Sequence, residues 1–176
     1  MTRYALFLRG VNVGGVNLKM AEVAAALTAA GFSEVRTLLA TGNVLVDSPA
    51  NPAKVRASAE AALRERFGYP AWVLVYDIET LRDIVAAYPF EPEVAGLHSY
   101  VTFVADDAAL TELAELAANA DEKIAVGEGV IYWQIPKGDT LTSTVGKTMG
   151  NKRYKSATTT RNLRTLSKVL QADAHR

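Results

Sequence analysis

Two short glycine-rich segments in the N-terminal half hold side chains that could do chemistry. Residues 9–17 read RGVNVGGVN, and residues 41–43 read TGN. Glycine permits a close backbone approach, arginine supplies a fixed positive charge, and asparagine both donates and accepts hydrogen bonds. This set suits a small anion or a phosphate. Tight turns also need glycine and asparagine, so a purely structural role is the alternative.

The first segment does not match the common nucleotide-binding motifs. Gly10, Gly14 and Gly15 do not fit the G-x-G-x-x-G pattern of dinucleotide-binding proteins. Gly10 and Gly15 have the spacing of a P-loop, but Val16 and Asn17 stand where that loop needs Lys and Ser or Thr. We therefore expect neither an NTPase nor a bound cofactor.

Composition excludes several other kinds of site. The chain has 176 residues and no cysteine, which rules out disulfides, a thiolate nucleophile and cysteine-ligated metals. Its two histidines, His98 and His175, lie far apart, so we expect no metal site. The apolar run at residues 4–8 is too short for a secretory signal, and no run is long enough to span a membrane. A cytoplasmic protein without membrane contact is expected.

Charge is distributed unevenly along the chain. The 19 basic and 19 acidic residues balance overall, but residues 1–136 have a net charge of −7 and residues 137–176 a net charge of +7. Residues 147–168 hold basic side chains and no acidic one. Three interpretations remain open for this basic tail: a solvated face docked on the acidic part of the chain, a surface for nucleic acid, or a site for a small anion.

Hydrophobic patterning in the first half predicts the order βαββαβ. Strands are expected at residues 4–8, 35–39, 44–46 and 72–76, with residues 41–43 as a hairpin turn. Apolar spacing predicts a helix from Met20 that Gly31 ends, and a second that opens at Asn51-Pro52 and ends at Gly68.

The second half partly repeats this order. A connecting helix at residues 78–88 precedes a strand at 100–104, a helix at 108–118 and strands at 123–126 and 130–135. After a turn-rich stretch at 136–157, a final helix is expected at 160–172, with Thr159 or Thr160 as its N-cap. The closing strand is missing from this prediction.

The fold class is therefore α+β, with two consecutive ferredoxin-like split βαββαβ units. The second unit is incomplete, the sheets are mostly antiparallel, and the helices pack on one face. We expect domains at residues 1–77 and 78–176, the second carrying the basic C-terminal helix. Right-handed crossovers place the loop after the first strand, the hairpin at 41–43 and the start of the first helix at the same end of the first sheet.

Three motifs resemble those of a bacterial family labelled domain of unknown function 1697. They are residues 8–15 (LRGVNVGG, with Lys19-Met20 following), 41–46 (TGNVLV) and 159–165 (TTRNLRT). They occur in the family's order and at similar spacing. Thr41 replaces the family's usual Ser and keeps the hydroxyl, whereas Leu163 replaces the usual Trp and removes a large aromatic ring. The resemblance implies no activity.

The three motifs lead to one hypothesis for the site, namely that their polar side chains converge on a small anionic or phosphorylated ligand. A buried structural network is the alternative. The candidate ligand-binding residues are Arg9, Asn12, Gly14, Gly15, Asn17, Thr41, Gly42, Asn43, Thr160, Arg161 and Asn162.

Two other functions stay open. A nucleic-acid-binding module would use the basic tail together with exposed strand aromatics, but Trp72 and Trp133 fit a core position better. An enzyme acting on a phosphorylated substrate would need a proton-transfer group, and the motifs contain no His, Cys, Asp or Glu.

Overall fold

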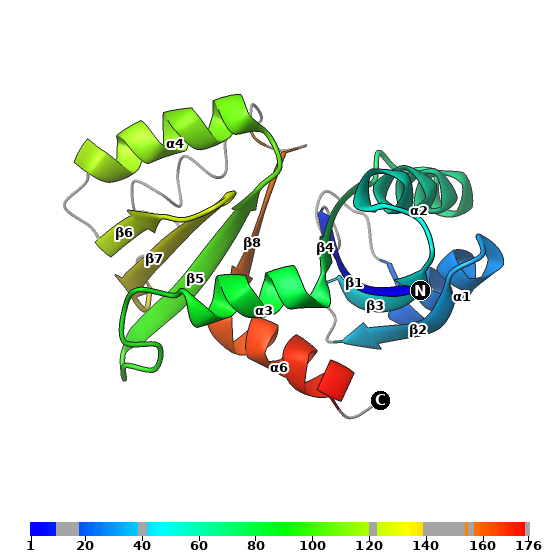
Figure 1. Cartoon of the computed structure of the whole chain (residues 1–176), viewed down its shortest axis with the longest axis horizontal. Coiled ribbons are helices and arrows are strands. Elements are labelled where there is room, and N and C mark those ends of the chain that lie inside the picture. The colour runs from blue at the N-terminus through cyan, green and yellow to red at the C-terminus, as the bar shows by residue number, and fades with distance from the viewer. Residues whose placement is uncertain (10–17, 39–41, 120–122, 139–153, 155–156, 175–176) are drawn as a thin grey trace. The chain divides into compact units, whose positions relative to one another are not determined.

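The protein forms two compact units, each built around a four-stranded antiparallel sheet (Figure 1). The first unit comprises Met1–Leu81 and Val169–Arg176, and the second Arg82–Lys168. The computed structural model describes residues 1–9, 18–38, 42–119, 123–138, 154 and 157–174. Within this part of the chain, no helix has the length and apolar character needed to cross a membrane.

The first sheet has the strand order β2-β3-β1-β4, with every neighbouring pair antiparallel, as in a ferredoxin-like unit. This agrees with the predicted order βαββαβ. The elements are β1 (Thr2–Arg9), α1 (Met20–Ala29), β2 (Ser33–Leu38), β3 (Asn43–Ser48), α2 (Pro52–Phe67) and β4 (Trp72–Asp77).

Local signals define the ends of these helices. The side chain of Asn51 accepts a hydrogen bond from the backbone N–H of Lys54 at 2.9 Å, and Pro52 occupies the first turn of α2. Gly68 then ends α2 in the left-handed conformation, with φ of 66°. Gly31, with φ of 103°, follows α1 in the same way. These predicted boundaries are confirmed.

The second sheet repeats the topology with the order β6-β7-β5-β8, again antiparallel throughout. The fold class predicted from the sequence is therefore confirmed: α+β, with two ferredoxin-like units. The elements of the second half are α3 (Ile78–Ala86), β5 (Leu97–Val104), α4 (Asp107–Asn119), β6 (Lys123–Val126), β7 (Val130–Pro136), β8 (Thr158–Asn162) and α6 (Leu163–Ala174).

Strand β8 corrects the prediction for the C-terminal region. The segment TTTRN was expected to lead directly into a helix from Thr160, but it pairs with β5 and closes the second sheet. Helix α6 starts only at Leu163, and the side chain of Asn162 accepts a hydrogen bond from the backbone N–H of Arg164 at 2.9 Å. The predicted N-cap at Thr159 or Thr160 is therefore wrong. Consecutive β-branched threonines favour a strand wherever a partner strand is available.

Each sheet buries one face under helices of its own unit. In the first unit, alternate residues of β1, Tyr4, Leu6 and Leu8, pack with Val23 and Leu27 of α1 and with the apolar face of α2. In the second unit, Ile131, Trp133 and Ile135 of β7 belong to one core cluster with Ala109 and Leu113 of α4. The opposite face of β7 contacts α3, where the Tyr132 hydroxyl donates to the carbonyl of Ile84 at 2.7 Å.

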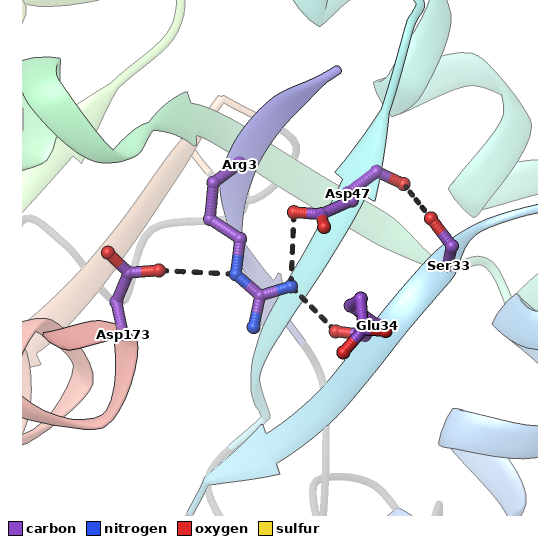
Figure 2. Close-up of polar contacts among 5 residues, drawn as sticks. All are labelled: Arg3, Ser33, Glu34, Asp47 and Asp173. Carbon is purple, nitrogen blue, oxygen red and sulfur yellow. Dashed lines mark hydrogen bonds and ion pairs between the residues drawn. The ribbon is translucent and has the colours of Figure 1, made fainter. Parts of the chain in front are cut away.

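The last turn of α6 is fastened to the first sheet by Arg3 (Figure 2). The Arg3 Nε lies 3.2 Å from Asp173 Oδ1, and its Nη1 lies 3.3 Å from Asp47 Oδ1 and 2.6 Å from the carbonyl oxygen of Glu34. Arg36 adds a hydrogen bond to the carbonyl of Ala172 at 3.1 Å. The end of the chain is thus part of the first unit.

Candidate functional site

The carboxyl end of β1 lies directly beside the β2–β3 hairpin. The backbone N–H of Leu8 donates to the carbonyl of Gly42 at 2.8 Å, and Phe7 pairs with Asn43 in the sheet register. Gly42 has φ of 83°, a conformation that favours glycine. The predicted meeting of the first strand's end with the hairpin is therefore confirmed. The candidate residues Asn12, Gly14, Gly15, Asn17 and Thr41 lie outside the described residues.

Arg9 ends β1 and projects from the sheet face opposite α1 and α2. Side chains alternate along a strand, so Arg9 shares this face with Phe7, while Leu8 joins the core beneath the helices. The Arg9 Nε is buried and has no hydrogen-bond partner in the part of the chain that the structure describes. Burial also lowers the pKa of the Arg9 guanidinium from its ordinary value. Arg9 is therefore a partly desolvated cation with an unsatisfied donor.

Asn43 is fully buried and stabilises the hairpin. Its register with Phe7 places it on the same sheet face as Arg9. Its amide nitrogen donates to the carbonyl of Leu38 at 3.1 Å, across the turn between β2 and β3. Asn43 therefore holds the hairpin strand next to Arg9 and has a structural role of its own.

Thr160 on β8 belongs to a hydrogen-bonded group inside the second sheet. Its hydroxyl lies 2.8 Å from the hydroxyl of Thr102 on β5, and the Trp133 indole N–H donates to the same Thr102 hydroxyl at 3.0 Å. Trp133 is 2% exposed, which confirms its expected core position. Its ring therefore offers no surface on which a nucleic-acid base could stack.

Arg161 and Asn162 are neighbours in the chain but project from opposite faces of β8. Arg161 pairs with Val101 and Asn162 with Tyr100 of β5, and successive strand residues face opposite sides. Arg161 is 8% exposed and donates from Nη1 to the Thr159 hydroxyl at 2.6 Å and to the carbonyl of Thr160 at 3.1 Å. Arg161 and Arg9 belong to different compact units, so their convergence on one ligand stays a prediction.

Asn162 borders a cavity of about 410 Å³ in the second unit. This cavity lies at the end of the sheet where β7 and β8 finish and β5 begins. Residues 92–99 form one wall, and the first turns of α6 form another. The polar and charged side chains that line it include Glu93, His98, Ser99, Lys137, Arg164 and Ser167 beside Asn162.

Hydrogen bonds fix the wall formed by residues 92–99. The Ser99 hydroxyl donates to the carbonyl of Pro92 at 3.0 Å. From behind, the amide nitrogen of Gln134 donates to the Ser99 hydroxyl at 3.1 Å and to the carbonyl of Glu91 at 2.7 Å. Gln134 is 4% exposed. The wall is therefore held by buried polar contacts.

Sequence reasoning found Asn162 but missed the rest of this cavity. His98 has no second histidine near it in the sequence, and Lys137 was counted only as part of the basic tail. These residues meet because β5 lies between β7 and β8, an arrangement that required β8 to be recognised as a strand. Among the described residues, no group of three or more acidic or histidine side chains could hold a metal ion.

The fold is a tandem of two ferredoxin-like units. The sequence then assigns the chain to a family. A family model described as "Protein of unknown function (DUF1697)" matches residues 1–132. The chain belongs to this family, which confirms the resemblance that the three motifs indicated. A comparison with curated proteins found no match.

Among solved structures, the chain is similar to a conserved bacterial protein, SP0830, from Streptococcus pneumoniae. The TM-score is 0.79 at 22% sequence identity, and the match covers 97% of each chain. At this identity the likeness concerns the fold. Because the match covers 97% of each chain, the two proteins share the tandem arrangement of elements along their length. It assigns no ligand.

Proposed function

We propose that this protein binds a small anionic ligand, carrying a phosphate or a carboxylate, at the carboxyl end of β1. The observation that supports this most directly is the state of Arg9. Its Nε is buried and has no hydrogen-bond partner in the described part of the chain, and burial lowers its pKa. A buried donor without a partner costs free energy, and more so on a charged group. An anion would satisfy both the donor and the charge.

The neighbours of Arg9 suit the same ligand. Gly42, whose carbonyl accepts a hydrogen bond from Leu8, leaves no side chain at the turn and lets a ligand approach the backbone. In the sequence, Asn12 and Asn17 follow Arg9, and Thr41 precedes Gly42. In the proposal, these three supply the neutral hydrogen bonds around the anion, and Asn43 holds the hairpin that presents them.

The experiment is a thermal-shift screen of phosphorylated and carboxylated metabolites on the wild type and on Arg9→Met. Methionine keeps much of the apolar stem and removes the guanidinium. The matched control is Arg66→Met, which removes an arginine of the same unit whose side chain is 53% exposed. At least one ligand that raises the Tm of the wild type and of the control should fail to raise that of Arg9→Met.

Two results would contradict the proposal. One is that every ligand shifts all three proteins equally. The other is that no small anion has any effect while a single-stranded oligonucleotide binds with steep salt dependence, which would favour nucleic acid.

A further inference from the structure

We propose that the cavity of the second unit is a separate site for a hydroxyl-rich small molecule that bears one anionic group, either a sugar phosphate or a sugar acid. Its volume of about 410 Å³ falls within the range of small-molecule pockets in proteins. All of its lining residues belong to the second unit, whereas Arg9 belongs to the first. The two sites can therefore be tested independently.

The half-buried residues that line the cavity offer hydrogen-bonding groups. Asn162 uses its amide oxygen to cap α6, and its amide nitrogen donates to none of the other described residues. His98 and Ser167, both half-buried, add an imidazole and a hydroxyl. Such groups recognise hydroxyls, because each hydroxyl both donates and accepts.

The polar wall behind Ser99 contains an unsatisfied acceptor. The Oε1 of Gln134 is buried and has no hydrogen-bond partner among the residues described. Buried polar atoms are nearly always paired, so this oxygen calls for a donor such as an ordered water or a hydroxyl. Gln134 does not line the cavity, so this acceptor belongs to the support of the wall and sets no requirement on the ligand.

The rim of the cavity carries the charge. Lys137 and Arg164 are both exposed, and Lys137 has no ion-pair partner in the described part of the chain. Arg164 lies 3.9 Å from Glu93, with side chains 70% and 76% exposed, a geometry in which an ion pair contributes little. Both cations can therefore bind an anion, while Glu93 disfavours a ligand with several negative charges. Hydrogen-bonding groups inside and two exposed cations at the rim match one anionic group on a polyhydroxylated body.

Titration calorimetry with four probes separates the parts of this proposal. The probes are glucose 6-phosphate, gluconate, glucose and inorganic phosphate. If glucose 6-phosphate binds and gluconate does not, the cavity is a sugar-phosphate site. If gluconate binds and glucose 6-phosphate does not, it is a sugar-acid site. In either case, glucose and phosphate should each bind at least tenfold more weakly, because each has only half of the recognised chemistry. The proposal is overturned if inorganic phosphate binds as tightly as the sugar anion, or if neither sugar anion binds.

Variants then locate the binding. Lys137→Met should weaken it about tenfold by removing one charge-assisted contact. Asn162→Asp should also weaken it, because aspartate still caps α6 but repels the anion. Lys123→Met, an exposed lysine of β6 outside the cavity, is the matched control and should bind as the wild type does.

A second readout follows His98 directly. The chain has only two histidines, so the imidazole signals in an NMR spectrum are readily assigned by His98→Gln. The His98 signal should shift as the sugar anion saturates the protein. Binding that leaves His98 unmoved, or that Arg9→Met abolishes while Lys137→Met leaves it intact, overturns this site and favours the one at β1 instead. Binding that survives Arg9→Met and fails in Lys137→Met supports this site independently of the first.

Discussion

Arg3 and Asp173 stand 170 positions apart in the sequence and form an ion pair of 3.2 Å. Their side chains are 8% and 15% exposed, so the pair is largely shielded from water. The same guanidinium bonds Asp47 and the carbonyl of Glu34, a non-glycine residue with φ of 49° (Figure 2). The contact joins the first strand of the first unit to the last turn of α6.

This contact has the opposite sense from the docking assumed in one of the three interpretations of the basic tail. Here the tail supplies the acidic partner, Asp173, and the N-terminal strand supplies the basic partner, Arg3. Asp173 is one of only two acidic residues after position 136. The weak pair of Arg164 with Glu93 has the expected sense. In the described part of the chain, residues 137–176 thus form ion pairs of both senses.

Arg3→Met should lower the free energy of unfolding by about 2–4 kcal/mol, because it removes the guanidinium that the shielded carboxylates of Asp47 and Asp173 both contact. Urea unfolding measures the loss. Arg66→Met is the control, since its pair with Glu22 is about half exposed on both sides and should be worth under about 1 kcal/mol. Equal losses in the two variants would show that the Arg3 contacts do not fasten the C-terminal turn.

Asn162→Ala should lower the free energy of unfolding by about 1 kcal/mol, because α6 loses the side chain that accepts from its first turn. Asn162→Asp should keep most of the stability, since aspartate is an equally good N-cap. Thr160 is one of the two caps predicted from the sequence, but its hydroxyl bonds Thr102 inside the sheet. Thr160→Val should therefore remove that contact and leave the cap of α6 intact. If the Asn162→Ala protein is as stable as the wild type, Asn162 does not stabilise α6 as its N-cap.

Stability at alkaline pH should depend on Tyr76. Burial raises the pKa of its phenol to about 12, an effect that the charge of Arg56 partly opposes. In the unfolded chain the phenol ionises near pH 10, so the neutral form is stabilised in the folded state and this contribution is lost as the pH rises from about 10 to 12. The free energy of unfolding should fall by about 2–3 kcal/mol more in the wild type than in Tyr76→Phe over this interval. Parallel pH profiles of the two proteins would contradict it.

Asn43→Ala should destabilise the ligand-free protein, whereas Arg9→Met should not. Asn43→Ala removes a fully buried amide and leaves the Leu38 carbonyl without this donor, which should cost about 1–3 kcal/mol of unfolding free energy. Arg9→Met removes a desolvated cation, so stability should be unchanged or slightly higher. Chemical denaturation of both variants checks this. A large loss in Arg9→Met would indicate a structural role for the guanidinium.

Much of the fold follows from local signals in the sequence. Asn51-Pro52 and Gly68 delimit α2 because capping depends on residues within one turn of the helix end. Strand β8 could not be found in this way, because its partner β5 lies more than fifty residues earlier and supplies the pairing that overrides the expected helix. The error had a consequence for the site: only in a strand do Arg161 and Asn162 face opposite sides.

The candidate site was predictable in part for the same reason. The meeting of Leu8 with Gly42 follows from the βαββ topology, which alternating hydrophobic patterns indicate. The cavity that joins His98, Lys137 and Asn162 depends on three segments brought together by the second sheet. No local pattern marks such an assembly.

The most direct test of anion binding at β1 is to observe the Arg9 Nε–H itself by nitrogen-15 NMR, assigned with Arg9→Met. During titration with the best anion from the thermal-shift screen, this resonance should move in a saturable way that tracks binding, and its exchange with water should slow as the donor gains a partner. The Arg66 Nε–H, exposed in the same unit, should stay in place. An Arg9 signal that does not change at saturation would contradict the proposed function.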